Sequence, residues 1–380
     1  MPVRTPSPSR RRTASSGGVP PALAVRLASA ARRLLLRLAD RCVPAPVVAL
    51  DHVHGFVRTY LMATAAELGV ADHLRARPLT AAELAPLVDA QPDVLHRVLR
   101  AAATFGMVRL DRGGRFHATR LTRALCSDHA WAIADWSRYL ATPSLQSAWC
   151  DLPTTVRTGD DAFRRVHGTD CFSWFAAHPD EGQRFAHGLG GLTRGEAAAI
   201  IAGYPFPRSG RVCDVGGGAG VLLAEILKAR PGLSGTLVES AHMLGEAKEL
   251  LDENEVLDRT ELVTGDFFEP LTVDADLYLL KWVLHDWDDD TCVRILANVA
   301  AAMPAGSRLL VIEGDQPVNR PHERFSLIDA QMLITAEGGR ERSGEELSRL
   351  VARSGLTPGA RRHTATGLVL VEGERSSRTA

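Results

Sequence analysis

The segment RVCDVGGGAGVLLAEILKA, residues 211–229, decides the fold of this chain. Residues 211–215 form a short apolar run typical of a buried strand, and residues 216–220 supply four glycines. Residues 221–229 are apolar enough for a buried helix, and residues 235–239 predict the next strand. Strand, turn, helix and strand form a βαβ unit, and such units build parallel sheets. The segment therefore predicts an α/β domain.

The same alternation continues to the end of the chain. Short apolar runs predict further strands at residues 261–263, 275–280, 308–312 and 367–372. An apolar-periodic stretch predicts a helix over residues 292–303. We expect a doubly wound α/β domain and place it at residues 181–374.

The glycine-rich turn predicts a nucleotide-like ligand, because glycines let the backbone approach a ligand closely beside a helix N-terminus. Val221 stands where the dinucleotide fingerprint needs a small residue, and no P-loop Gly-Lys follows. Glu239 ends the second strand, where an acid can hydrogen-bond both ribose hydroxyls of an adenosine. Asp266 and Phe267 follow the third strand and suit an adenine amino group and ring. Taken alone, those two residues are more typical of loop and core positions.

The acids Asp286, Asp288, Asp289 and Asp290 allow two interpretations. Hard cations such as Mg²⁺ need convergent oxygen ligands. Acids in the first turn of a helix instead interact favourably with its dipole and cap it. We favour the second interpretation, because the helix over residues 292–303 follows directly, and we predict no metal.

The first residues of the chain differ in composition from the rest. Residues 1–21 are rich in Pro, Ser, Gly and Arg and contain no acid, which predicts a disordered basic tail. Residues 22–40 carry Leu23, Leu27, Leu34 and Leu38 on one helical stripe. Such a helix suits either a membrane surface or packing on its own domain or a partner subunit. We favour packing, because the apolar face is narrow.

Short helices followed by a hairpin fill the region before the α/β domain, which we place at residues 22–180. The pattern predicts one helix over residues 52–75 and a second opened by the capping box of Thr80 and Glu83. A third helix starts at residues 92–93 and ends near residue 106, and two short strands surround a turn at residues 111–114. This order predicts a winged helix.

A winged helix raises the alternative of a DNA-binding regulator. The third helix carries two cations, Arg97 and Arg100, and one acid, Asp93. Its net positive charge is small for a helix that binds DNA. We therefore expect a packing or dimerisation module.

Composition narrows the class of protein. The chain has 380 residues and a formal net charge of −1, which excludes a global basic field for nucleic acid or anionic membranes. Its six cysteines form no CxxC pair, so neither a zinc finger nor a redox motif is indicated. Scattered cysteines fit a reducing cytoplasm. No stretch approaches about 18 apolar residues, so we expect no membrane-spanning helix.

The motifs together resemble those of the S-adenosylmethionine-dependent O-methyltransferases, most closely the caffeate and polyketide (hydroxyl-aromatic) family. The resemblance rests on residues 214–220, Glu239, residues 265–267 and the block KWVLHDWDD at residues 281–289. It covers about residues 50–372. It implies a Rossmann-like class I methyltransferase domain preceded by a mainly helical, winged-helix dimerisation domain, and hence a homodimer.

The resemblance also implies roles for individual residues. The residues implied to bind S-adenosylmethionine, which is released as S-adenosylhomocysteine, are Gly216, Gly218, Glu239, Asp266, Phe267 and Lys281. His285 matches the general base of the family, and Glu313 and Glu341 match the two acids that orient it. A histidine within reach of a phenol can remove its proton as the methyl group arrives. Without the resemblance, His285 would be more typical of a helix-capping residue.

We therefore predict a cytoplasmic O-methyltransferase that acts on a phenolic hydroxyl of an aromatic substrate in antibiotic or other secondary metabolism. We expect neither nucleic acid nor a membrane as a partner. Two alternatives are a hydroxylase or decarboxylase that retains the cofactor and the fold, and the DNA-binding regulator.

Overall fold

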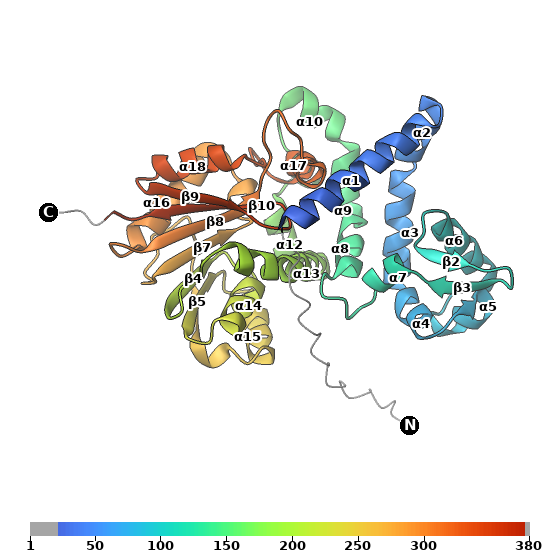
Figure 1. Ribbon diagram of the computed structural model, residues 1–380, viewed down its shortest axis with the longest axis horizontal. Helices are drawn as coiled ribbons and strands as arrows, with labels where there is room; N and C mark the ends of the chain where they lie inside the picture. Colours follow the sequence, from blue (N-terminus) through green and yellow to red (C-terminus); the bar gives the residue numbers. More distant parts are fainter. Residues whose placement is uncertain (1–21, 377–380) are drawn as a thin grey trace.

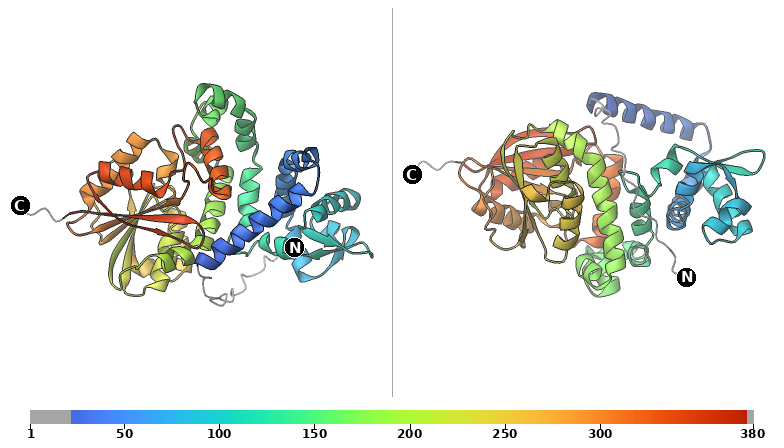
Figure 2. Two further views of the ribbon diagram at one scale, coloured as in Figure 1. Left: turned by 45° about the horizontal axis from the view of Figure 1, so that its top comes forward. Right: turned by 90° about the horizontal axis from the view of Figure 1, so that it is seen from below.

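The computed structural model describes residues 22–376 and has two parts joined by long helices (Figure 1). The N-terminal helices and a small sheet lie at one end, and a large sheet with helices on both faces lies at the other. Figure 2 shows α13 (Pro179–Gly203) running alongside the large sheet, between it and the N-terminal part. The basic tail expected over residues 1–21 lies outside the described residues.

The described part of the chain begins with a long exposed helix, α1 (Ala22–Arg41). It confirms the helix expected over residues 22–40. Leu27, Leu34 and Leu38 on its stripe are all exposed, so this stripe does not pack on the rest of the chain.

The single helix expected over residues 52–75 is wrong. The chain forms α2 (Ala45–Val53), α3 (Gly55–Glu67) and α4 (Val70–Ala76) instead. Gly69 separates α3 from α4 with a φ of 65°, a left-handed conformation that glycine adopts without steric cost.

The winged-helix order is confirmed. The small sheet has the strand order β1-β3-β2, formed by β1 (Leu79–Thr80), β2 (Val108–Leu110) and β3 (Arg115–Ala118). Its helices are α5 (Ala81–Leu84), the 3₁₀ turn η1 (Ala85–Leu87) and α6 (Pro92–Thr104). The capping box forms as expected, with the Thr80 amide donating to Glu83 at 2.7 Å and the Glu83 amide donating to the Thr80 hydroxyl at 3.2 Å.

A set of shorter helices leads from the small sheet to α13. They are α7 (Arg120–Ala124), α8 (Ile133–Leu140), α9 (Pro143–Cys150), α10 (Leu152–Thr158), α11 (Ala162–His167) and α12 (Cys171–Ala177). Their core is aromatic, and the buried ring of Tyr139 lies 5.1 Å from Phe185 and 6.1 Å from Phe175.

The large sheet has seven strands in the order β6-β5-β4-β7-β8-β10-β9. They are β4 (Gly210–Val215), β5 (Leu233–Glu239), β6 (Thr260–Thr264), β7 (Leu277–Lys281), β8 (Arg308–Gly314), β9 (Thr357–His363) and β10 (Leu368–Glu374). The first five in spatial order pair in parallel, whereas β10 is antiparallel to both neighbours. All expected strands are present, and β9 is an addition. Every residue of β9 is exposed, so it carries no apolar run that would reveal it.

Helices cover both faces of this sheet (Figure 2). They include α14 (Val221–Ala229), α15 (Leu244–Glu253), α16 (Asp289–Ala302), α17 (Glu323–Thr335) and α18 (Gly344–Arg353), with the 3₁₀ turns η2 (Leu257–Arg259) and η3 (Leu284–Asp286). The helix expected over residues 292–303 starts earlier than expected, at Asp289.

Because β4, β5 and β7 are parallel, their carboxyl ends meet at one edge, where ligands bind in open α/β sheets. No helix in the described part of the chain is long and apolar enough to cross a membrane.

Candidate active site

The glycine-rich turn after β4 and the acid at the end of β5 are in direct contact. Gly216 and Gly218 have positive φ angles of 68° and 57°, which explains the need for glycine at both positions. Glu239 accepts a hydrogen bond from the Gly218 amide at 2.9 Å, and its other oxygen accepts from the Ser240 amide at 2.7 Å. The structure thus brings together three residues that the sequence analysis assigned to the cofactor.

A buried acid lies beneath this turn. Both carboxylate oxygens of Asp214 are buried without a hydrogen-bond partner among the described residues. Burial, and to a smaller extent the charge of Glu239, raise the pKa of Asp214 to about 7, although Lys281 opposes this shift. A side chain at Gly217 would clash with Asp214, whereas no described atom lies within 4 Å of the position for a Cβ on Gly218. Gly217 is thus packed against the buried carboxylate, whereas Gly218 leaves room for a ligand to approach the backbone closely.

Phe267 lies beside the turn, as expected for an adenine-packing residue. A Cβ on Gly216 would lie 3.3 Å from its ring. The neighbouring Gly265 amide donates to the Glu239 carbonyl at 3.1 Å, which holds the loop after β6 against the end of β5. Asp266 is exposed, and its carboxylate accepts from the Phe268 amide at 2.8 Å.

Lys281 at the end of β7 takes part in a buried ionic cluster. Its ammonium lies 3.2 Å from a carboxylate oxygen of Glu196 and donates to the Thr193 hydroxyl at 3.0 Å. Arg324 from α17 lies 2.5 Å from the other oxygen of Glu196. Burial lowers the pKa of Lys281, and the charge of Glu196 opposes this. Glu196 was not predicted from the sequence, because nothing near it on α13 marks it as functional.

Trp282 joins this cluster to the histidine. Its backbone has a φ of 54°, which is unusual for a bulky residue. Its indole donates to Glu196 at 3.3 Å, and its ring centroid lies 4.8 Å from that of His285.

His285 stands on the short turn η3 and is held by acids on both ring nitrogens. Nδ1 lies 2.8 Å from Oε1 of Glu341, and Nε2 lies 3.5 Å from Oδ1 of Asp286. Burial alone would lower the pKa of His285, but the charge of Asp286 and the hydrogen bond to Glu341 outweigh it and raise the pKa to about 10.

Glu313, at the end of β8, contacts the same turn differently. Its Oε1 accepts from the backbone amides of Val283 and Leu284 at 3.2 and 2.9 Å. Burial raises the pKa of Glu313 to about 7. Ligand atoms of His285, Glu313 and Glu341 all lie within 4.8 Å of one another. The three residues expected to be catalytic therefore form one cluster, in which Glu341 contacts the imidazole and Glu313 bonds the backbone before it.

Among the acids after the histidine, Asp288 to Asp290 act as the capping interpretation predicts, whereas Asp286 contacts the imidazole. Asp288 caps α16 by accepting from the amides of Asp290 and Thr291, both at 2.9 Å. Asp289 and Asp290 pair with arginines, at 2.8 Å to Arg342 and 2.6 Å to Arg353.

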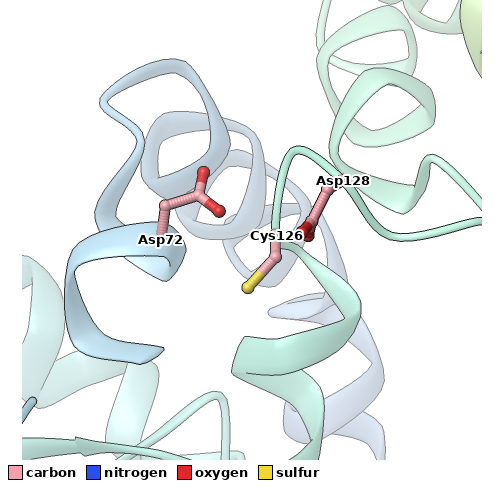
Figure 3. A group of neighbouring side chains, drawn as sticks. All are labelled: Asp72, Cys126 and Asp128. Carbon is pink, nitrogen blue, oxygen red and sulfur yellow. The ribbon is translucent and has the colours of Figure 1, made fainter. Parts of the chain in front are cut away.

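A second group of acids and a thiol lies far from this site, in the N-terminal part. Figure 3 shows Asp72 on α4 facing Cys126 and Asp128 on the segment after α7. Arg75 donates to Asp128 at 2.6 Å and lies 3.5 Å from Asp72, and Asp72 also accepts from the Ser127 amide. These contacts join α4 to the segment after α7, so we assign the group a structural role.

Comparison with known proteins identifies both parts of the chain. Residues 50–128 match the O-methyltransferase dimerisation domain, and residues 149–357 match the O-methyltransferase domain. The mitomycin biosynthesis 6-O-methyltransferase of Streptomyces lavendulae is 38% identical over 309 residues, which cover 80% of this chain and 87% of that protein.

Solved structures agree with this match. The crystal structure of LaPhzM has a TM-score of 0.83 at 34% identity and covers 88% of this chain and 100% of its own. The O-methyltransferase NcsB1 from neocarzinostatin biosynthesis, solved with S-adenosylmethionine and 2-hydroxy-5-methyl naphthoic acid, has a TM-score of 0.70 at 33% identity. It covers 83% of this chain and 95% of its own. The chain therefore belongs to the S-adenosylmethionine-dependent O-methyltransferases of the hydroxyl-aromatic family.

Proposed function

We propose that this enzyme methylates a phenolic hydroxyl of an aromatic secondary metabolite, with His285 as the general base. The observation that carries the proposal is the 2.8 Å contact between His285 Nδ1 and the buried Glu341. It occupies Nδ1, so an acceptor would be reached by Nε2, whose contact with Asp286 is longer, at 3.5 Å. Bound S-adenosylmethionine supplies an activated methyl group, so positioning of the acceptor and removal of its proton are the tasks left to the chain.

Several residues are arranged to hold the cofactor. We propose that Glu239 binds the ribose, that Asp266 and Phe267 frame the adenine, and that Gly216 and Gly218 give room for the methionine part. The contact of Glu239 with the Gly218 amide and the position of Phe267 beside Gly216 support this. The ammonium of Lys281 is already paired with Glu196. We therefore propose that Lys281 supports the cofactor site without contacting the cofactor through its ammonium.

The raised pKa of His285 fits the chemistry of a phenol. A phenol has a pKa of about 10, and the pKa of His285 is also about 10. Proton transfer between the two groups is then close to balanced in free energy, but His285 can accept the proton only after it has lost its own. At pH 7 both groups carry a proton in the resting state, so formation of the reactive complex releases one proton.

The aromatic helices beside η3 suit an aromatic acceptor. Burial raises the pKa values of Tyr139 and Cys171 well above their usual range, and the charge of Asp286 adds to both shifts. Tyr139 and Cys171 belong to one buried cluster, against which Phe175 and Phe185 pack, and the ring of Tyr139 lies next to both phenylalanine rings. We propose that this aromatic cluster forms one wall of the acceptor site.

We further propose that the enzyme acts as a homodimer in the cytoplasm. The match to a dimerisation domain and the exposed apolar side chains Val53 and Phe56 on α2 and α3 support the dimer. Free cysteines in the described residues suit a reducing compartment. Sedimentation of the full chain should give the mass of two copies, and a monomer would refute this part of the proposal.

The activity is tested by incubating the purified full chain with S-adenosylmethionine and a panel of hydroxynaphthoates, phenazinols and hydroxybenzoates. We expect formation of S-adenosylhomocysteine together with a product heavier by one methylene unit. A product that instead gains oxygen or loses carbon dioxide would contradict methyl transfer and favour the hydroxylase or decarboxylase. Replacement of His285 by alanine should lower formation of the methylated product by about 100- to 10,000-fold.

A further inference from the structure

Arg342 is a buried cation next to the catalytic acid Glu341. Its side chain is only 1% exposed. Burying an ionised group is costly unless hydrogen bonds and an opposite charge compensate it. Its contacts therefore indicate why an arginine stands at this position.

Those contacts fall on the turn that carries His285. The guanidinium donates to the Leu284 carbonyl at 2.9 Å and to the Trp287 carbonyl at 2.7 Å. These carbonyls lie on either side of His285 and Asp286 in the chain. A single 3₁₀ turn such as η3 leaves most of its carbonyls without partners inside the turn, so it depends on donors from elsewhere.

The opposite end of the turn is held by Glu313, which accepts from the amides of Val283 and Leu284. One buried acid thus binds the amides at the start of the turn, and one buried arginine binds its carbonyls. Since Glu341 contacts the imidazole of His285, two consecutive residues fix the ring and its backbone.

We infer that Arg342 is a positioning residue of the methyl-transfer reaction, which sets the place of the His285 imidazole by clamping the backbone on both sides of it. The inference rests on the proposed function. Displacing a reacting group by about 1 Å can cost about 100-fold in rate. Loss of the clamp should therefore lower turnover more than it lowers cofactor affinity.

The chain offers a matched control in Arg340. Both arginines pair with Asp289, Arg340 at 3.1 Å and Arg342 at 2.8 Å. The other partner of Arg340 is Glu346 on α18, at 3.0 Å. Replacing Arg340 therefore disturbs the same ion pair without removing a hydrogen bond to the carbonyls around His285.

The test compares Arg342→Lys, Arg342→Met and Arg340→Gln in the full-length protein. We expect Arg342→Lys to lower kcat by about 10- to 100-fold with affinity for S-adenosylmethionine, measured by calorimetry, changed less than about twofold. Arg340→Gln should retain wild-type kcat. If Arg342→Met does not fold, Arg342→Lys still tests the inference. Lysine keeps the positive charge but cannot hold both carbonyls in the fixed geometry of the arginine guanidinium.

A second readout does not depend on turnover. The imidazole signals of His285 in the NMR spectrum, assigned by their loss in His285→Ala, should titrate at a lower pH in Arg342→Lys, because the contact with Glu341 loosens. Arg340→Gln should leave this titration unchanged. A folded Arg342→Lys with wild-type kcat and titration would overturn the inference. If instead His285→Ala keeps full turnover, the proposed function fails, and the titration alone still tests whether Arg342 positions the ring.

Discussion

His285 and Glu341 lie 56 positions apart in the chain, yet Nδ1 of the imidazole is 2.8 Å from Oε1 of the carboxylate. The Glu341 side chain is fully buried. A carboxylate at Nδ1 fixes the tautomer of a histidine and stabilises its protonated form. The pair therefore determines the direction in which Nε2 points and, together with the charge of Asp286, makes His285 a stronger base.

Replacement of Glu341 by glutamine tests this pair. The amide keeps the size of the side chain but loses the charge, so the pKa of His285 should fall toward its ordinary value. At about pH 10, where His285 is also available as the neutral base in the wild type, we expect kcat to fall by about 10- to 100-fold, as measured with a methyl acceptor at saturating cofactor. The exposed Glu337 on the same connection offers the control Glu337→Gln, which should behave as wild type. Equal activity of the two variants would show that Glu341 does not assist catalysis.

The pH dependence of activity follows from the raised pKa of His285. The free enzyme holds His285 protonated up to about pH 10, and a general base must be neutral. We expect kcat/KM to rise by about tenfold per pH unit between about pH 6 and 9. The measurement should use an acceptor whose hydroxyl does not ionise in this pH range. The change in rate then reports the titration of His285 and not that of the substrate. A profile that is flat above pH 7 with such an acceptor would contradict the assigned pKa.

Stability should also depend on pH, through buried acids. Asp214 and Glu313 have pKa values of about 7 in the folded chain, whereas unfolded carboxyl groups titrate near about 4. The folded state thus holds protons that the unfolded chain has lost, so these groups favour folding at low pH. Their contribution is lost as the pH rises from about 4 through 7.

Replacement of Asp214 by asparagine removes one of these groups. The unfolding free energy of Asp214→Asn should fall less steeply between about pH 5 and 8 than that of the wild type. The variant should also be more stable than wild type at pH 8, since no buried charge then lies under the glycine turn. Denaturant melts at several pH values measure both effects, with Asp274→Asn at an exposed site as the control. Parallel pH profiles for Asp214→Asn and wild type would refute this interpretation of Asp214.

Sequence patterns predicted the parts of the fold that bury apolar residues. The strands β4 to β8 and the glycine turn were evident because their apolar runs and glycines are local features. The edge strand β9 was not, since all its residues are exposed. The break between α3 and α4 was missed because the apolar periodicity continues through Gly69.

The active site was predictable only in part. The spacing around Gly216 and Glu239 indicated a nucleotide-like ligand, whereas the roles of His285, Glu313 and Glu341 came from family resemblance. Glu196 and Arg342 carried no sequence signal, because their functions depend on contacts made across the fold. Glu196 reaches Lys281, which lies 85 positions away, only after α13 packs on the sheet.

The ionic cluster around Glu196 gives a prediction about stability. Glu196→Ala leaves the buried Lys281 without its carboxylate partner, and breaking a buried pair in this way costs about 3–5 kcal/mol. We expect a clear fall in Tm and a loss of the Trp282 signal in near-ultraviolet circular dichroism, since the indole also bonds to Glu196. Glu323→Ala, at an exposed acid whose ion pair with Arg32 spans 3.9 Å, is the control. A Glu196→Ala melt equal to that of the control would show that the cluster contributes little.

The most direct test of the account is His285→Ala, with cofactor binding and methyl transfer measured on the same preparation. The ring nitrogens of His285 contact Glu341 and Asp286 and not the glycine turn that is proposed to hold S-adenosylmethionine, so calorimetry should show wild-type affinity for the cofactor. Methyl transfer to an accepted phenol should fall by about 100- to 10,000-fold. A variant that binds the cofactor and retains full turnover would contradict the assignment of His285 as the general base.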